Sequence, residues 1–322
     1  MTCNKINCNY MAMKNNRVLI TGGAGFLGSH LCDHLIKKGY EVICLDNFYT
    51  GTRHNIEHLL QHPRFKIIHH DVIDPIILDI NEIYHLACPA SPIQYQRYPV
   101  NTIRTCVQGT LNMLNLSKEV GARFLLASSS EVYGDPSIHP QPENYWGNVN
   151  PIGERACYDE GKRCAEALVV SYAKQYGVEI KIARIFNTYG PRLLEGDGRV
   201  VSSFIVQALN NEPLTIFGDG SQTRSFCYSS DLIKGLVLLM SSNISVPVNL
   251  GNPEEITVSE LANTIISLSD SKSTLVYRSL PADDPVKRRP DISIATKYLE
   301  WSPNISLDSG LKATISYFHG SL

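Results

Sequence analysis

The sequence predicts an α/β protein in which helices cover both faces of a parallel sheet. Short apolar, β-branched runs alternate with helical stretches through the first 186 residues, as expected for strands joined by crossover helices. A glycine-rich turn follows the first of these runs. The composition, 43% hydrophobic and 19% charged, is that of an ordinary globular chain, and 322 residues correspond to roughly two domains.

The elements follow in order along the chain. Strands are predicted at 17–21, 41–46, 65–70, 82–86, 122–128 and 179–185, and helices at 26–38, 100–118 and 157–176. After about residue 186 the alternation weakens and glycine and proline become frequent, which indicates a smaller, lid-like region. We therefore predict a loose tail at 1–16, a first domain at 17–186, and a second domain at 187–322 with segments that return to the first.

Charge and cysteine content exclude several classes of protein. With 29 basic and 31 acidic residues the chain has no basic field for nucleic acid or an anionic membrane. The nine cysteines are odd in number and widely spaced, so we interpret them as reduced thiols, and we expect no metal site. Because the chain has no run of roughly 20 apolar residues and no apolar core near its start, we expect a cytoplasmic protein without a membrane segment.

The glycine-rich turn has the spacing of a dinucleotide site. Gly22, Gly25 and Gly28 follow the first strand and open the first helix together with Phe26 and Leu27. Glycines at such positions allow a tight turn, the approach of backbone to a pyrophosphate, and close packing of helix on strand. The helix N-terminus then faces the anion with free amides.

Acidic residues at the following strand ends extend this prediction. Asp46 ends the second strand, where a carboxylate can accept hydrogen bonds from ribose hydroxyls and would repel a 2′-phosphate, which favours NAD over NADP. Asn47 follows it, and Asp71 and Val72 come where an adenine contact is expected. An ordinary turn aspartate at 46 and a simple loop acid at 71 remain the alternatives.

Tyr158 and Lys162 form a candidate redox pair. Four residues apart, they share one helical face. A free phenol has a pKa of about 10, and a neighbouring ammonium and a nicotinamide cation both favour the phenolate. Such a tyrosine can take a proton from a sugar hydroxyl while hydride leaves the same carbon. The alternative is a surface tyrosine beside a solvated lysine.

These motifs together resemble the extended short-chain dehydrogenase/reductase family. The glycine loop, the serines at 128–130 ahead of YxxxK, and RIFNTYGPR at 184–192 carry that resemblance. Longer runs are most similar to the UDP-glucuronate decarboxylase branch of the family: HLACPASP at 85–92, SEVYGDP at 130–136, RACYDEGKR at 155–163, GSQTR at 220–224 and NLGNPEE at 249–255.

The resemblance implies a two-part architecture and an internal redox cycle. A Rossmann-type NAD-binding domain would be joined by a smaller nucleotide-sugar-binding domain, with the UDP-sugar in the cleft between them. The helices at 100–118 and 157–176 would pair into the four-helix bundle of a homodimer. Bound NAD would take hydride from C4 of UDP-glucuronate and return it after loss of CO2, so that UDP-xylose forms through a 4-keto intermediate.

The resemblance also assigns roles to individual residues. Tyr158 would be the base, tuned by Lys162, and Ser129 would hydrogen-bond the C4 oxygen. Glu131 would lie near C5 and govern its protonation, while Ser130 stands where related 4,6-dehydratases carry an acid. The expected substrate contacts are Arg288 on the diphosphate, Arg199, Arg224 and Asn187 on the substrate, Arg104 near the carboxylate, and Pro89 and Ser91 around the sugar.

Two other functions stay open at this point. One is a nucleotide-sugar 4,6-dehydratase or 4-epimerase, which would release no CO2. The other is a catalytically silent NAD-sensing or scaffold protein of the same fold, although a sensor has no need of Tyr158, Lys162 and Glu131 together.

Overall fold

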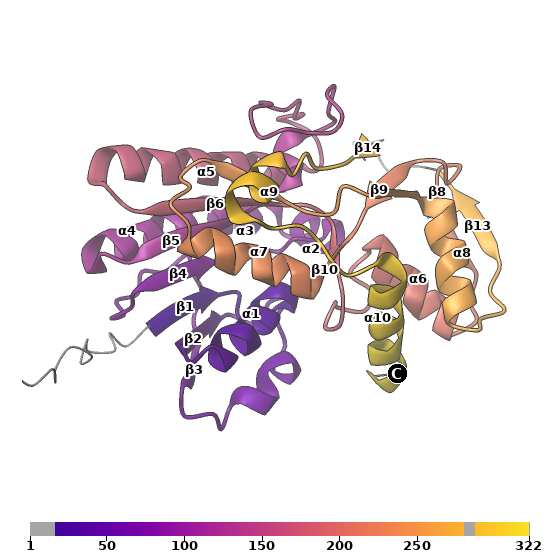
Figure 1. Ribbon diagram of the computed structural model, residues 1–322, viewed down its shortest axis with the longest axis horizontal. Coiled ribbons are helices and arrows are strands. Elements are labelled where there is room, and N and C mark those ends of the chain that lie inside the picture. Colours follow the sequence, from indigo (N-terminus) through magenta and orange to yellow (C-terminus); the bar gives the residue numbers. More distant parts are fainter. Residues whose placement is uncertain (1–16, 280–286, 322) are drawn as a thin grey trace, which may run out of the picture.

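A seven-stranded parallel sheet organises the computed structural model, which describes residues 17–279 and 287–321 (Figure 1). The predicted tail at 1–16 lies outside the described residues. The strand order is β11-β6-β5-β4-β1-β2-β3, and every neighbouring pair is parallel. These strands are β1 (Arg17–Thr21), β2 (Glu41–Asp46), β3 (Phe65–His69), β4 (Glu82–His85), β5 (Arg123–Ser129), β6 (Ile180–Ile185) and β11 (Pro247–Leu250).

Both faces of the sheet are buried, which explains why its strands are continuously apolar. Val18 and Ile20 of β1 pack into one core cluster, and Leu19 between them packs into the other. The first face is covered by α1 (Phe26–Lys37), α7 (Ser229–Ser241) and α9 (Ser293–Leu299), and the second by α4 (Thr110–Val120) and α5 (Ala156–Tyr176). The predicted doubly wound α/β fold is confirmed.

The helix predicted at 100–118 is interrupted in the structure. It consists of α3 (Pro99–Arg104), a π-helical turn η2 (Thr105–Gly109) and α4. Shorter elements precede it, namely the 3₁₀ helix η1 (Arg53–Leu59) and α2 (Pro92–Arg97), and the 3₁₀ turn η3 (Ser130–Tyr133) follows β5. A π turn often occurs at a functional site, because it adds a residue to the helix and redirects the side chains there.

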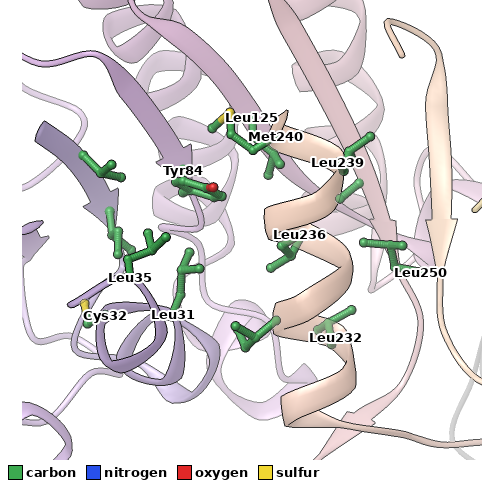
Figure 2. Packing of buried hydrophobic residues seen from close by; sticks show 14 of the residues in the cluster. Leu31, Cys32, Leu35, Tyr84, Leu125, Leu232, Leu236, Leu239, Met240 and Leu250 are labelled. Carbon is green, nitrogen blue, oxygen red and sulfur yellow. The ribbon is translucent and has the colours of Figure 1, made fainter. Parts of the chain in front are cut away.

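The chain returns to the sheet after residue 229, through elements that the sequence reading did not locate. Helix α7 packs beside α1, and β11 adds the edge strand next to β6. Figure 2 shows Leu31 and Leu35 of α1 and Leu232, Leu236 and Met240 of α7 in one packed layer. The segment 229–250 therefore belongs to the sheet-based core.

The remaining elements form a smaller body with its own core. Figure 1 shows α6, α8, α10, β8 and β13 gathered to one side of the sheet. Their apolar side chains make a separate cluster around Phe204, Leu261 and Phe318. The elements are β7 (Thr188–Tyr189), α6 (Val200–Leu209), β8 (Leu214–Phe217), β9 (Thr223–Ser225), β10 (Cys227–Tyr228), β12 (Glu255–Thr257), α8 (Val258–Leu268), β13 (Leu275–Arg278), β14 (Lys287–Arg288) and α10 (Leu307–Ser321).

The strand order sets the position of the site. From β1 the chain moves one way to β2 and β3, whereas from β4 it moves the other way to β5 and β6, although β1 and β4 are neighbours. The loops after β1 and β4 therefore diverge and leave a crevice at the carboxyl ends of the strands. No helix within the described part of the chain is both long and apolar enough to cross a bilayer.

Candidate active site

A cavity of about 1510 Å³ lies at this crevice, between the sheet and the smaller body. It is large enough for an extended ligand such as a dinucleotide together with a second molecule. All but one of the site residues expected from the sequence line it: Gly22, Gly25, Phe26, Leu27, Gly28, Asp46, Asn47, Asp71, Val72, Pro89, Ser91, Ser129, Ser130, Glu131, Tyr158, Lys162, Asn187, Arg199, Arg224 and Arg288.

The exception is Arg104. It ends α3 with an exposed side chain and is not among the cavity-lining residues. The structure therefore does not bring this arginine to the position expected for a contact to the substrate carboxylate.

The glycine loop forms a backbone cradle at one end of the cavity. Gly22 has φ +69°, and a Cβ there would lie 3.0 Å from Ala87 in the loop after β4. A Cβ on Gly28 would collide with the carbonyl oxygen of Gly22, so the helix can approach the strand end only without a side chain. Gly25 is the N-cap of α1, whose first amides are free to meet an anion.

Asp46 joins this loop to the end of β2. Its carboxylate is buried, and its two oxygens accept hydrogen bonds from the amides of Ala24 at 2.9 Å and Phe48 at 2.8 Å. Burial raises the pKa of Asp46, and the two amide hydrogen bonds oppose that effect. Each oxygen keeps a lone pair, so the carboxylate can still accept hydrogen bonds from a pair of hydroxyls.

The neighbouring strand end forms a second polar wall. The amide nitrogen of Asn47 donates to Asp71 at 2.8 Å, and the other carboxylate oxygen of Asp71 accepts from the backbone of Ile73 at 3.0 Å. Val72 is 3% exposed and packs so closely on the π turn η2 that a Cβ on Gly109 would lie 2.6 Å from its side chain. These contacts fix the loop after β3 against the helix layer.

Tyr158 and Lys162 lie in the first half of α5, and both are 5% exposed. The Lys162 ammonium donates to the carbonyl of Ala127 at 2.8 Å and lies 5.7 Å from the centre of the Tyr158 ring. Burial raises the pKa of Tyr158 well above its ordinary value, while a hydrogen bond with Ser129 lowers it. Burial thus has the largest influence on this pKa in the protein alone, and the effects expected from the Lys162 ammonium and a nicotinamide cation stay predictions.

A second tyrosine, which the sequence reading missed, lies flat on the first. The rings of Tyr95 and Tyr158 are 4.9 Å apart and 10° from parallel. The Tyr95 hydroxyl is buried and has no hydrogen-bond partner in the described part of the protein. The same holds for the buried hydroxyl of Ser91 at the start of α2. No sequence pattern marks Tyr95, because α2 meets α5 only through the tertiary fold.

Glu131 lies at the centre of a charged cluster. Arg155 donates to one of its carboxylate oxygens at 2.6 Å, and Arg288 approaches the same oxygen at 3.2 Å. Burial raises the pKa of Glu131, but the two guanidinium groups more than offset that effect, so the pKa is lowered overall. The carboxylate is therefore held ionised although it is largely removed from water.

Arg288, for which a contact to the diphosphate stays a prediction, lines the cavity and is held by protein groups. It is 2% exposed, and its guanidinium donates to the backbone carbonyl of Ser130 as well as contacting Glu131. The physical reason is charge: a buried guanidinium next to a buried carboxylate pairs with it. In this structure Arg288 is thus a partner of Glu131 at the cavity wall.

Asp159 adds a second carboxyl to the cluster and was also missed. It lies 4.0 Å from Arg155 on the next turn of the helix. Burial and the charge of Glu131 raise its pKa to about 7. The spacing of Arg155 and Asp159, four residues apart beside Tyr158, is the sequence signal that could have revealed it.

The remaining expected substrate residues come from the smaller body and its connection. Asn187 follows β6, Arg199 precedes α6, and Arg224 lies in β9. Arg199 is held by Asp197 at 3.2 Å, and Arg224 donates to the carbonyl of Thr223 at 2.9 Å. Together with Arg288, these two arginines bring three guanidinium groups to the lining of the cavity.

Comparisons with known proteins agree with this geometry. The model of the NAD dependent epimerase/dehydratase family matches residues 18–251. The UDP-glucuronic acid 4-epimerase from Bacillus cereus, solved in complex with UDP-glucuronic acid and NAD, is 30% identical with a TM-score of 0.87, over 95% of this chain and 100% of that chain.

Curated relatives are more similar in sequence. UDP-glucuronic acid decarboxylase 1 from Arabidopsis thaliana is 58% identical over 309 residues, which are 96% of this chain and 71% of the relative. UDP-glucuronic acid decarboxylase 1 from Danio rerio is 58% identical over 306 residues, covering 95% of this chain and 73% of the relative. The chain therefore belongs to the NAD dependent epimerase/dehydratase family, and within it to the group of the UDP-glucuronic acid decarboxylases.

Proposed function

We propose that this protein is an NAD-dependent UDP-glucuronate decarboxylase that forms UDP-xylose. The observation that carries the proposal is the placement of the Tyr158–Lys162 pair and the ion-paired Glu131 on one cavity. The Tyr158–Lys162 pair suits oxidation at a sugar hydroxyl, and Glu131 suits control of a proton at the neighbouring carbon. The 58% identity to UDP-glucuronic acid decarboxylases supports the same reaction.

NAD fits the glycine-loop end of the cavity. Without a Cβ at Gly22 and Gly28, the loop after β4 and the start of α1 can approach the end of β1 closely. This packing is what a pyrophosphate at the helix N-terminus requires. The Asp46 carboxylate retains acceptors for the adenosine ribose, and its charge disfavours a phosphate there. Bound NAD supplies the hydride acceptor and donor, and its cationic ring adds the positive charge that Tyr158 needs in this desolvated position.

The oxidation step would be run by Tyr158 and Ser129. Tyr158 takes the proton of the sugar C4 hydroxyl while hydride leaves C4, and Ser129 hydrogen-bonds the same oxygen. Lys162, fixed on the carbonyl of Ala127, holds its positive charge near the phenol throughout the cycle. The product is a ketone β to the carboxylate on C5.

That ketone makes loss of CO2 possible. The electrons of the breaking C5–C6 bond move into the carbonyl as an enolate instead of remaining on C5 as a carbanion. Glu131, held ionised by Arg155 and Arg288, would then govern the proton that returns to C5. Return of hydride to C4, with Tyr158 giving back its proton, completes the conversion.

A 4,6-dehydratase is less well supported. That reaction needs an acid for the leaving hydroxyl on C6, and the residue beside Glu131 is Ser130, a much weaker acid. A 4-epimerase needs no carboxylate at position 131, whereas here two arginines are committed to one. A silent sensor would have no use for either arrangement.

We also propose a division of labour and an assembly. Residues 17–186 would bind NAD and 187–322 mainly the UDP-sugar, with 229–250 returning to the first part. A homodimer would form by pairing the helices of α3 to α5 with those of a second copy into a four-helix bundle. Val100 and Ile103 of α3 and Tyr176 of α5 are exposed and apolar, which supports this surface. The molar mass from light scattering tests the dimer.

The reaction is tested by incubating the protein with UDP-glucuronate labelled at the carboxyl carbon. We expect label in CO2, UDP-xylose by proton NMR, and no net NADH. Retention of the label in a UDP-sugar would assign the chain to a dehydrating or inverting reaction. Bound NAD without turnover of any nucleotide sugar would indicate the sensor.

A further inference from the structure

Two cysteines meet beside the Tyr158–Lys162 pair. Cys88 lies in the loop after β4, and Cys106 lies in the π turn η2. Their sulfur atoms are 3.2 Å apart, within hydrogen-bond distance. The seven cysteines of the described residues are free thiols, so this contact joins two reduced side chains.

A π turn and a glycine allow the two cysteines to come into contact. The π turn carries Cys106, and Gly161 of α5 faces it: a Cβ on Gly161 would lie 3.0 Å from the Cβ of Cys106 and 3.1 Å from its sulfur. Gly161 directly precedes Lys162. The pair is therefore packed against the turn of α5 that carries the proposed catalytic residues.

The two thiols differ in access and in charge. Cys88 lines the cavity, whereas Cys106 lies behind it and is 2% exposed. The hydrogen bond with Cys106 and the charge of Lys162 lower the pKa of Cys88 and together outweigh its burial. The same hydrogen bond, followed by burial, raises the pKa of Cys106. Cys88 is thus the attacking thiolate, and Cys106 is the thiol placed to resolve it.

We propose that Cys88 and Cys106 form a modification site for peroxides, at which the two thiols close into a disulfide that reversibly stops turnover. The Cys88 thiolate attacks one peroxide oxygen, the O–O bond breaks, and a sulfenic acid and water form. The Cys106 thiol then attacks the Cys88 sulfur, the S–O bond breaks, and a second water leaves. Two thiols are oxidised by two electrons, and the peroxide is reduced to water.

Closure has a direct route to the cavity. A disulfide requires a sulfur–sulfur distance of about 2.05 Å, so the two sulfurs must approach from 3.2 Å. The movement draws the loop after β4 toward the π turn. That loop also carries Pro89 and Ser91 on the cavity wall, and the π turn packs against α5 next to Lys162. Both walls around Tyr158 are displaced together.

Peptide mapping of the full-length protein tests bond formation directly. Trypsin cleaves after Lys66, Arg97, Arg104 and Lys118, so Cys88 and Cys106 fall in separate peptides, 67–97 and 105–118, each with one cysteine. After treatment with hydrogen peroxide we expect these two peptides to be linked, and dithiothreitol to separate them. Failure of the linked species to form, while other cysteines of the same sample are oxidised, would overturn the proposal.

Activity measurements test the consequence. In the wild-type chain, loss of activity should follow the linked fraction, and dithiothreitol should restore it. Linked peptides with unchanged activity would overturn the proposal as well. The activity measurement rests on the proposed decarboxylase function, whereas the peptide mapping does not. A wrong function and a wrong disulfide are therefore distinguishable.

Two variants separate the pair from other thiols. Cys106→Ser keeps the side-chain size and should remove the link. Without the resolving thiol, prolonged peroxide treatment should carry Cys88 past the sulfenic acid, which dithiothreitol reduces, to the sulfinic acid, which it does not, so recovery is lost. Cys164→Ser, which removes an exposed thiol on the same helix α5, should behave like the wild type. Recovery in Cys106→Ser equal to that of the wild type, or protection by Cys164→Ser, contradicts the assignment. The mapping on the wild-type chain stands even if a variant does not fold.

Discussion

The two ends of the cavity are built in different ways. At the glycine-loop end the contacts come from backbone and from residues that directly follow consecutive strands, such as Gly22 and Asp46. At the other end, side chains from distant parts of the chain meet: Arg155 is 24 residues from Glu131, and Arg288 is 157 residues away. The first end is determined by local geometry and the second by charge pairing across the tertiary fold.

Electrostatics sharpens this contrast. Asp46 is stabilised by two amide donors, and burial still raises its pKa. Glu131 is also largely removed from water, but two guanidinium groups lower its pKa. A carboxylate with neutral donors can bind neutral hydroxyls, whereas one with fixed cations is suited to act near charged intermediates.

The largest effect is expected where the two ends meet, at Tyr158. Tyr158→Phe removes the proposed base and keeps the ring that stacks on Tyr95. Loss of a positioned general base lowers the rate roughly 100- to 10,000-fold. Rapid-mixing absorbance should show no transient NADH with UDP-glucuronate, while NAD binding persists. Normal transient NADH in this variant would assign the first proton transfer to another group.

The charged end is broken by Glu131→Ala. The change leaves Arg155 and Arg288 without their shared carboxylate, and we expect the steps after oxidation to slow by about tenfold or more. Single-turnover measurements compare NADH formation with CO2 release. Glu131→Gln is the matched control, since it keeps the bulk without the charge. Equal slowing of both steps would remove the role given to this residue.

The glycine-loop end is tested by Asp46→Ala. Ribose hydroxyls left without an acceptor should weaken NAD binding by about 1–3 kcal/mol, measured by calorimetry. Asp46→Asn retains one acceptor oxygen and should lose less. Turnover at saturating NAD should change little in both variants. An affinity equal to that of the wild type would show that the carboxylate only caps the loop.

A smaller effect is expected on the pH dependence of stability, which tests the charged cluster around Glu131. The folded state raises the pKa of Asp159 from 3.8 to about 7. Between these two pKa values, the folded protein keeps a proton on Asp159 that the unfolded chain has lost. The free energy of unfolding therefore falls as pH rises through this range, by at most about 1.4 kcal/mol per pH unit. Asp159→Asn should remove this slope in urea unfolding between pH 5 and about 7.

A control variant separates this effect from general titration. Glu119→Gln changes an exposed carboxyl on α4 and should leave the slope intact. A wild-type slope that Asp159→Asn does not alter would place the proton elsewhere in the cluster. Glu131 contributes with the opposite sign, because its pKa is lowered and its stabilisation is lost as pH falls.

The smallest effect is expected outside the cavity. Arg104 is exposed and does not line the site, so Arg104→Ala should change KM for UDP-glucuronate less than about twofold. Arg199→Ala, on the cavity wall, is the matched comparison and should raise KM clearly more. A large rise for Arg104→Ala would restore the contact that the resemblance implied.

Local patterns explain which features could be predicted. Strands buried on both faces are continuous apolar runs, so β1 to β6 were found within about a residue or two of their ends. The glycine loop and Asp46 follow from the same local register. Strand β11 is only Pro247–Leu250, and nothing in those residues tells which sheet they join.

Side-chain partners were much less predictable. An arginine in the sequence indicates a positive charge, but its partner depends on the tertiary fold, so the pairing of Arg288 with Glu131 was not predicted. The stacking of Tyr95 on Tyr158 and the contact of Cys88 with Cys106 likewise join elements that are remote in sequence. The pKa of Tyr158 was judged from its charged neighbours, whereas burial has the larger influence.

The return of the chain through α7 and β11 determines whether the first 186 residues can fold on their own. A fragment that stopped at residue 186 would expose the hydrogen-bonding edge of β6 and uncover the leucines of α1 that α7 shields. Such an unprotected edge invites pairing with other molecules. The first 186 residues are therefore not a detachable module, and the nascent chain must emerge well past the cofactor half before that half can close its own interior.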